Sequence, residues 1–154
     1  HYERAETAYE RLLELDPGAP IHGQRGQVRF SHAGARGSAG SPTEAARWAR
    51  LAIADLGLAL AADPEDETTR DALANSWQVL AISALLTQDP ASEKEAIERC
   101  AEQRRWLVER FPERASTRIA MAESCRELAR LHRPGGPLED DAAAQRLTRD
   151  AEEH

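Results

Sequence analysis

Three pairs of arginine and serine recur along the chain and are the first candidates for chemistry. Each arginine lies six residues before its serine, and the pairs are Arg25 with Ser31, Arg70 with Ser76, and Arg118 with Ser124. A guanidinium group donates several hydrogen bonds at once and suits carboxylate or phosphate oxygens, so such a ladder could bind anions. Alternatively, each arginine bonds a neighbouring helix end while the small serine allows two helices to come close. We favour this structural interpretation, because regular repetition is typical of packing.

Histidine and cysteine offer little for metal binding or nucleophilic catalysis. No histidine stands in a His-Glu-x-x-His or Cys-x-x-Cys pattern, and the five are His1, His22, His32, His132 and His154. Cys100 and Cys125 fall on helices that would be neighbours, so they could approach each other, but small buried core residues are the favoured interpretation. No Ser-His-Asp or Cys-His arrangement is suggested by spacing. We therefore expect no metal, no cofactor and no enzymatic activity.

Two further patterns invite a functional interpretation and do not support it. Residues 34–40 are rich in glycine, but the Gly-Lys-Ser/Thr ending of a phosphate loop is missing and no strand precedes them. We expect a flexible hairpin loop there. Carboxylates cluster at residues 65–67 and 139–141, where predicted helices start and negative charge compensates the helix dipole.

Composition predicts one all-α domain. The chain has 154 residues, 5% aromatic residues and abundant alanine, which favours helices over strands. Its net charge of -7 gives no electrostatic footprint for nucleic acid or an anionic membrane. No stretch is long and apolar enough to resemble a signal peptide or a membrane span, and two cysteines make no disulfide framework. We expect a cytoplasmic protein, and the preference for arginine over lysine suggests a bacterial one.

Proline residues divide the chain at regular intervals. Pro17, Pro64 and Pro112 are separated by 47 and 48 residues, which indicates a repeat. Residues 69–81 and 117–129 also match, with seven identical positions among those aligned. We expect repeats over residues 18–64, 65–112 and 113–154, preceded by a helix over 2–15. Because the helical pattern begins as early as Tyr2, we also expect the chain to be part of a longer polypeptide.

Apolar spacing and breaking residues predict seven helices. Ser41 with Glu44, and Ser92 with Glu95, form candidate capping boxes. Breaks are expected at residues 16–18, 88–90 and 134–137. The expected helices cover residues 2–15, 19–33, 41–62, 65–86, 92–110, 113–132 and 138–152, and the second of these is the poorest because of its glycines.

The repeats resemble the tetratricopeptide repeat family. In that family small residues lie where the two helices of a repeat touch. Leu73, Ala74 and Trp77 match the first helix, as do Met121, Ala122 and Cys125. The second helix is matched at the family's spacing by Ala52, Leu56, Ala59 and Pro64, and by Ala5, Tyr9, Leu12 and Pro17. The resemblance implies a right-handed α-α superhelix, or solenoid, of antiparallel hairpins.

The chain departs from the family pattern in three places. A repeat of that family has about 34 residues, whereas these have 47 and 48, so a variant with long helices, as in multidomain bacterial signalling proteins, is the closest match. The second-helix match weakens at Cys100, Arg104 and Leu107. In the first repeat, Arg29 and His32 occupy positions where a small and an aromatic residue are expected.

The resemblance also implies a binding surface along the concave face of the solenoid, formed by the first helix of each repeat. These groove positions fall on Phe30, Thr68, Asp71, Asn75, Gln78, Val79, Ser116, Ile119, Glu123, Arg126 and Glu127. Their mixed charge lacks the lysine set that clamps a terminal carboxylate. We expect a scaffolding module that binds a protein or peptide, or another domain of the same polypeptide. Two alternatives are the regulatory or sensor region of a multidomain protease or kinase, and a homo-oligomeric scaffold. A solvated face without a ligand also remains open.

Overall fold

The described part of the chain is organised as a row of seven α-helices. The computed structural model describes residues 2–16, 20–132, 136–137 and 140–153, and this part of the chain contains no strand. The predicted all-α fold is therefore confirmed. The helices are α1 (Tyr2–Leu15), α2 (His22–Ser38), α3 (Pro42–Ala62), α4 (Glu67–Leu86), α5 (Pro90–Arg110), α6 (Ala115–His132) and α7 (Asp141–Glu153). The predicted breaks at Pro17 and Gly18 and at Pro134 and Gly135, and the carboxylate of Glu139, lie outside the described residues.

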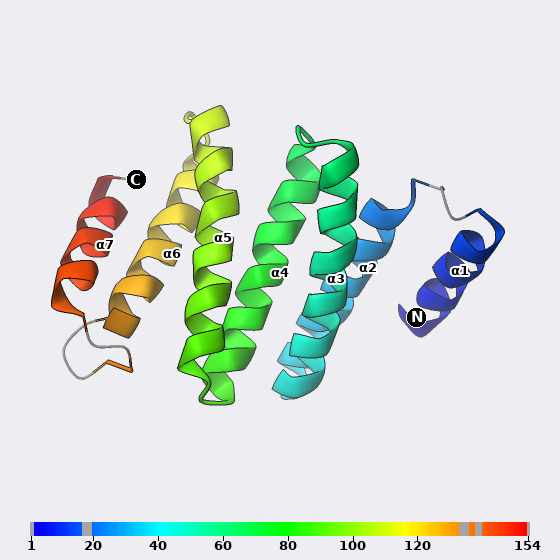
Figure 1. Ribbon diagram of the computed structural model, residues 1–154, viewed down its shortest axis with the longest axis horizontal. Coiled ribbons are helices and arrows are strands. Elements are labelled where there is room, and N and C mark those ends of the chain that lie inside the picture. Colours follow the sequence, from blue (N-terminus) through cyan, green and yellow to red (C-terminus); the bar gives the residue numbers. More distant parts are fainter. Residues whose placement is uncertain (1, 17–19, 133–135, 138–139, 154) are drawn as a thin grey trace.

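Each helix packs against the next one in the chain, so the seven helices follow one another along the longest axis of the molecule (Figure 1). α2 pairs with α3, α4 with α5, and α6 with α7. Beyond these neighbours, α2 also approaches α4, with Cα atoms within 8 Å. No Cα atom of α6 comes that near to α4, although both helices are described in full. The two junctions between successive hairpins therefore differ.

The helix α2 is longer than the sequence predicts. Residues 34–38 continue the helix instead of forming a glycine-rich loop, and only Gly40 has a positive φ, of 75°. Helical glycine costs about 1 kcal/mol relative to alanine, but Ala33 lies fully buried next to this segment. Packing of α2 against α3 thus extends the helix through residues that a local pattern assigns to a loop.

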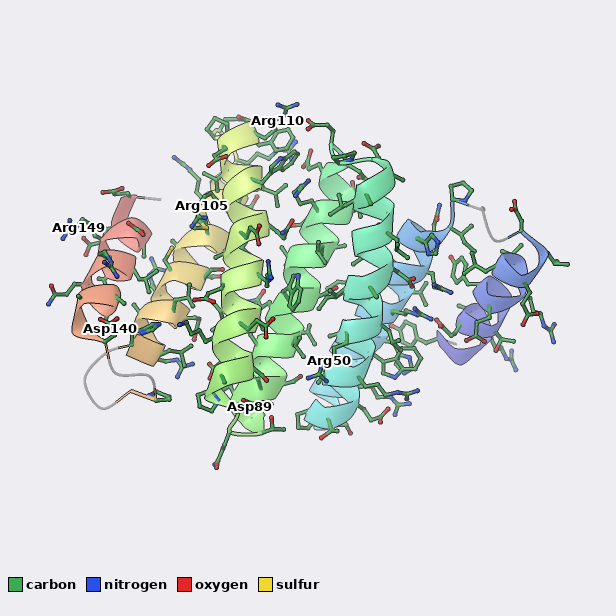
Figure 2. The ribbon with its side chains drawn as sticks, in the orientation of Figure 1. Arg50, Asp89, Arg105, Arg110, Asp140 and Arg149 are labelled. Atoms are coloured by element: carbon green, nitrogen blue, oxygen red, sulfur yellow. The ribbon has the colours of Figure 1, made fainter. Side chains whose placement is uncertain are left out.

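The start of α5 corrects one predicted cap. The N-cap is Asp89, whose carboxylate accepts a hydrogen bond from the backbone N–H of Ser92 at 3.1 Å, with Pro90 in the first helical turn. Ser92 is therefore inside the helix and does not form a capping box with Glu95. Figure 2 places Asp89 at one end of α5 and Arg110 at the other, so both charges complement the helix dipole.

The other two predicted starts also differ in detail. Ser41 precedes α3 and Pro42 begins it, but the Ser41 side chain makes no capping hydrogen bond. At α4, Asp66 is the N-cap and accepts from the backbone N–H of Thr69 at 3.1 Å. Of the three carboxylates at residues 65–67, only Glu67 lies in the first turn of the helix.

An apolar core runs through the row of helices from α2 to α7. The buried residues of α3 and α5 recur at helical spacing and form one stripe along each helix. Leu56 of α3 is fully buried and packs with Ala72 and Leu73 of α4. A second cluster continues from Ala33 in α2 to Ala151 in α7.

The two residues that depart from the family pattern in α2 have a structural explanation. Arg29 donates to the buried carboxylate of Asp55 at 2.7 Å and also pairs with Glu6 of α1. His32 lies between Tyr2 of α1 and Trp48 of α3, with ring centroids 4.9 and 4.2 Å away. These contacts attach α1 to the α2–α3 hairpin.

Candidate functional site

Two of the three recurring arginines, Arg25 and Arg70, bond within the fold, as the structural interpretation predicted. Arg25 donates to Asp55 at 2.8 and 2.5 Å, and this hydrogen bonding raises the pKa of the Arg25 guanidinium above its ordinary value. Arg70 donates to Gln103 of α5 at 2.9 Å and to the carbonyl oxygen of Pro64 at 2.6 Å. The side chain of Arg118 is exposed. The hydrogen bonds of Arg25 and Arg70 hold helices together and do not form an anion ladder.

The serines of these pairs turn toward their own helices. Ser76 is fully buried and donates to the carbonyl oxygen of Ala72 at 2.8 Å. Ser124 donates to the carbonyl oxygen of Ala120 at 3.3 Å. Both therefore satisfy their hydroxyl groups locally while occupying little space between helices.

A hollow of about 390 Å³ opens between α4 and α6, over α5. We refer to this cavity as the α4–α6 hollow. Its lining residues come from all three helices: Gln78, Ala81, Ile82 and Leu85 from α4, Glu93, Ile97, Cys100 and Arg104 from α5, and Glu123, Ser124 and Glu127 from α6. Its volume is at the lower end of the range for ligand pockets, about 300–1,000 Å³.

One position of the repeat distinguishes the two junctions. In α3 it is occupied by Leu56, which touches Gly26 of α2 closely and packs against α4. Forty-eight residues later, at the equivalent position of α5, it is Arg104. The Arg104 guanidinium reaches Gln78 of α4 at 2.6 Å and Ser124 of α6 at 2.8 Å. The side chain of Arg104 thus forms a long, polar bridge between α4 and α6. At the junction of α2 and α4, the equivalent position is filled by a leucine.

Arg104 is 94% buried, at 6% exposure, yet its hydrogen-bond partners are neutral oxygens. Besides Gln78 and Ser124, it donates to the carbonyl oxygen of Ala120 at 2.9 Å. A buried cation is usually paired with an anion. Because these partners carry no negative charge, they leave the positive charge of Arg104 unneutralised at this end of the α4–α6 hollow.

The other end of the α4–α6 hollow holds a buried carboxylate. Glu93 is 3% exposed and pairs with Arg130 of α6. Burial raises the pKa of Glu93 above its ordinary value, and the nearby positive charge of Arg130 opposes the shift. Arg130 also binds Glu127 on its own helix at 3.1 Å. This end of the cavity is therefore bordered by Glu93 and Glu127, both of which pair with Arg130.

The structure separates the predicted groove residues into groups. Gln78, Glu123 and Glu127 line the α4–α6 hollow. Ile119 and Arg126 instead line a second depression between α6 and α7. Phe30 is half-buried and packs against the core cluster around Leu56. The remaining predicted positions are exposed or half-buried on α4 and α6: Thr68, Asp71, Asn75, Val79 and Ser116.

Sequence reasoning missed the residues that give the α4–α6 hollow its charge and its apolar edge. Glu93 and Arg104 lie at helical spacing with Ile97, Cys100 and Leu107, which form the buried stripe of α5. Two charged residues within an apolar stripe are a signal that could have been recognised from the sequence. Ile82 and Leu85 are exposed apolar residues late in α4 and gave no such signal.

The cysteines and histidines form no metal-binding group among the described residues. Cys100 and Cys125 are free thiols, both buried, and burial raises the pKa of each. A raised pKa reduces the nucleophilic thiolate fraction. Within the described part of the chain, no group of three His, Cys, Asp or Glu side chains could hold a metal ion.

Comparison with known proteins adds no assignment. No family model, curated protein or solved structure matches the chain. Among the described helices, none combines the length and apolar character needed to cross a membrane.

Proposed function

We propose that this chain is a protein-interaction module that binds a peptide or helical segment in the α4–α6 hollow. The segment belongs either to a partner protein or to another domain of the same polypeptide. The observation that carries the proposal is the hollow itself, which brings the predicted groove residues Gln78, Glu123 and Glu127 together with two exposed apolar side chains. An apolar surface flanked by a few placed polar groups favours ligand binding.

We also propose that the chain is a long-helix member of the tetratricopeptide repeat family. Three antiparallel hairpins in sequence, and the approach of α2 to α4 as the first helices of successive hairpins, support this assignment. Such solenoids bind partners on extended surfaces because each repeat contacts only its neighbours.

Selection from a library of random peptides tests the proposed function. Peptides enriched on the native chain are expected to lose about tenfold in affinity when Ile82→Asp places a carboxylate at the mouth of the α4–α6 hollow. Leu58→Asp is the matched control, because Leu58 lies on α3 outside this hollow and has a similar exposure, 54% against 51% for Ile82. Fluorescence anisotropy measures the affinity, and far-UV circular dichroism verifies that both variants stay folded.

Two outcomes of the selection contradict the proposed function. One is the enrichment of no peptide on the native chain. The other is an equal effect of the Ile82 and Leu58 substitutions, which would mean that peptides bind elsewhere.

A further inference from the structure

The α4–α6 hollow has an ordered distribution of charge and apolar surface. Arg104 follows Glu93 by eleven positions in α5, a distance of about 16 Å along a helix that rises about 1.5 Å per residue. The floor between them is formed by Ile97 and Cys100, both buried. The mouth therefore leads onto an apolar floor with a fixed cation at one end and an ion pair at the other.

The apolar surface is concentrated on the α4 side. Ile82 is 51% exposed and Leu85 is 45% exposed, and both line the α4–α6 hollow together with Ala81. Exposed large aliphatic side chains beside a cavity favour an aliphatic group of a ligand, because contact removes apolar surface from water.

The negative charge is concentrated on the α6 side. Glu123 and Glu127 are exposed and stand one helical turn apart at the edge of the α4–α6 hollow. Arg130 partly neutralises Glu127, while Arg104 lies deep inside and is held by neutral oxygens. A cationic group of a ligand is thus attracted to the rim and repelled from the interior near Arg104.

We infer that the α4–α6 hollow selects a peptide in which an aliphatic side chain lies close in sequence to arginine or lysine. The aliphatic side chain packs between Ile82, Leu85 and Ile97, and the cationic group lies against Glu123 and Glu127. This inference rests on the proposed function, and it adds the chemistry of the partner. The net charge of -7 favours the same partner at longer range.

Three fluorescent peptides of equal length test this chemistry on the whole chain. One alternates leucine with arginine, the second leucine with glutamate, and the third alanine with arginine. The leucine–arginine peptide is expected to bind at least about tenfold more tightly than either of the others in an anisotropy titration. Its affinity is expected to fall when sodium chloride is raised from about 50 to about 500 mM, because salt screens the exposed carboxylates.

Charge reversal at the rim provides the decisive variant. Glu123→Lys combined with Glu127→Lys is expected to weaken the leucine–arginine peptide by about tenfold or more. The matched control combines Glu152→Lys and Glu153→Lys on α7, which changes the net charge equally at exposed positions outside the α4–α6 hollow. The control is expected to bind with nearly native affinity.

The outcomes separate the specificity from the proposed function. Tighter binding of the leucine–glutamate peptide, with loss on Ile82→Asp, overturns the inferred chemistry and leaves the hollow as a peptide site. Equal weakening by the rim variant and the α7 control also overturns it, because the attraction would then follow net charge. If sedimentation of the chain alone changes on Ile82→Asp, a second copy occupies the hollow and the inference fails. If no peptide, including those from the selection, depends on Ile82, the proposed function fails as well.

Discussion

Substitution of Gly26 by alanine probes the close contact between α2 and α3. A Cβ atom at Gly26 would lie 2.6 Å from Cγ and 2.8 Å from Cδ2 of Leu56, and 3.2 Å from the Leu56 backbone nitrogen. Leu56 is fully buried, so its side chain has no free space to enter. The backbone contact means that a change of rotamer cannot relieve the whole clash. The two helices must move apart.

Gly34 offers a matched control on the same helix. A Cβ atom there meets no atom within 4 Å, and the residue has helical geometry. Gly34→Ala is therefore expected to stabilise the protein by about 0.5–1 kcal/mol, since alanine restricts the unfolded chain and favours helix. Gly26→Ala gains the same helix preference but overpacks the core, at a cost of about 1–3 kcal/mol. We expect a net loss of about 1–2 kcal/mol in the free energy of unfolding.

Urea unfolding followed by far-UV circular dichroism measures both variants, and linear extrapolation gives the free energies. A double-mutant cycle identifies the cause. Leu56→Ala removes Cγ and Cδ2, so adding Gly26→Ala in that background is expected to be neutral or stabilising, with a coupling energy of about 1–3 kcal/mol. If Gly26→Ala is as stable as Gly34→Ala in the native background, the inferred steric contact between Gly26 and Leu56 is refuted.

Two further predictions concern buried and capping carboxylates. Asp55 is 2% exposed, so Asp55→Asn is expected to cost about 3 kcal/mol of folding stability because it leaves Arg25 without its anion. As a control, Glu65→Gln breaks an exposed pair with Arg110 and is expected to cost under about 1 kcal/mol. Equal losses of stability in urea unfolding would contradict this prediction. Hydrogen bonds from the Thr69 hydroxyl and backbone N–H lower the pKa of Asp66. Its ionised form therefore stabilises the folded state at pH values above the ordinary aspartate pKa of about 3.9. This stabilisation is lost as the pH falls through the lower pKa of the folded state. Asp66→Asn retains a capping oxygen without titrating, and its stability deficit relative to the native chain is expected to shrink below about pH 4; a deficit that is independent of pH would contradict the assignment.

The helical architecture could be predicted because its signals are local. Apolar spacing, proline positions and the recurrence of residues 69–81 at 117–129 all act within one or two helices. The extension of α2 through Gly34 could not be predicted in this way, because the stabilising contacts come from α3. Local preference assigns this segment to a loop, and tertiary packing makes it helical.

The candidate site was predictable only in part. The first-helix positions Gln78, Glu123 and Glu127 followed from repeat register, and the structure brings these three onto one cavity. The repeat register alone could not show that Ile119 and Arg126 line the depression beside α7 instead of this cavity. Which surface a residue of α6 lines depends on how far α6 lies from α4. α4 and α6 lie apart where the side chain of Arg104 bridges them. In the sequence, Arg104 is one of the positions at which the match to the repeat family weakens.

The charged residues of α5 argue that the α4–α6 hollow is more than a packing defect. Glu93 and Arg104 occupy positions in a stripe that is otherwise apolar. Buried charges are expensive, and apolar residues of similar volume are often as stable or more stable in their place. The raised pKa of Glu93 reflects this cost directly, because burial disfavours its ionised form. Leu56 shows that the same repeat position accepts an apolar residue and closes the junction. Stability alone would favour a leucine at position 104, so the arginine, which bridges α4 and α6, supports the proposal of a peptide site between these helices.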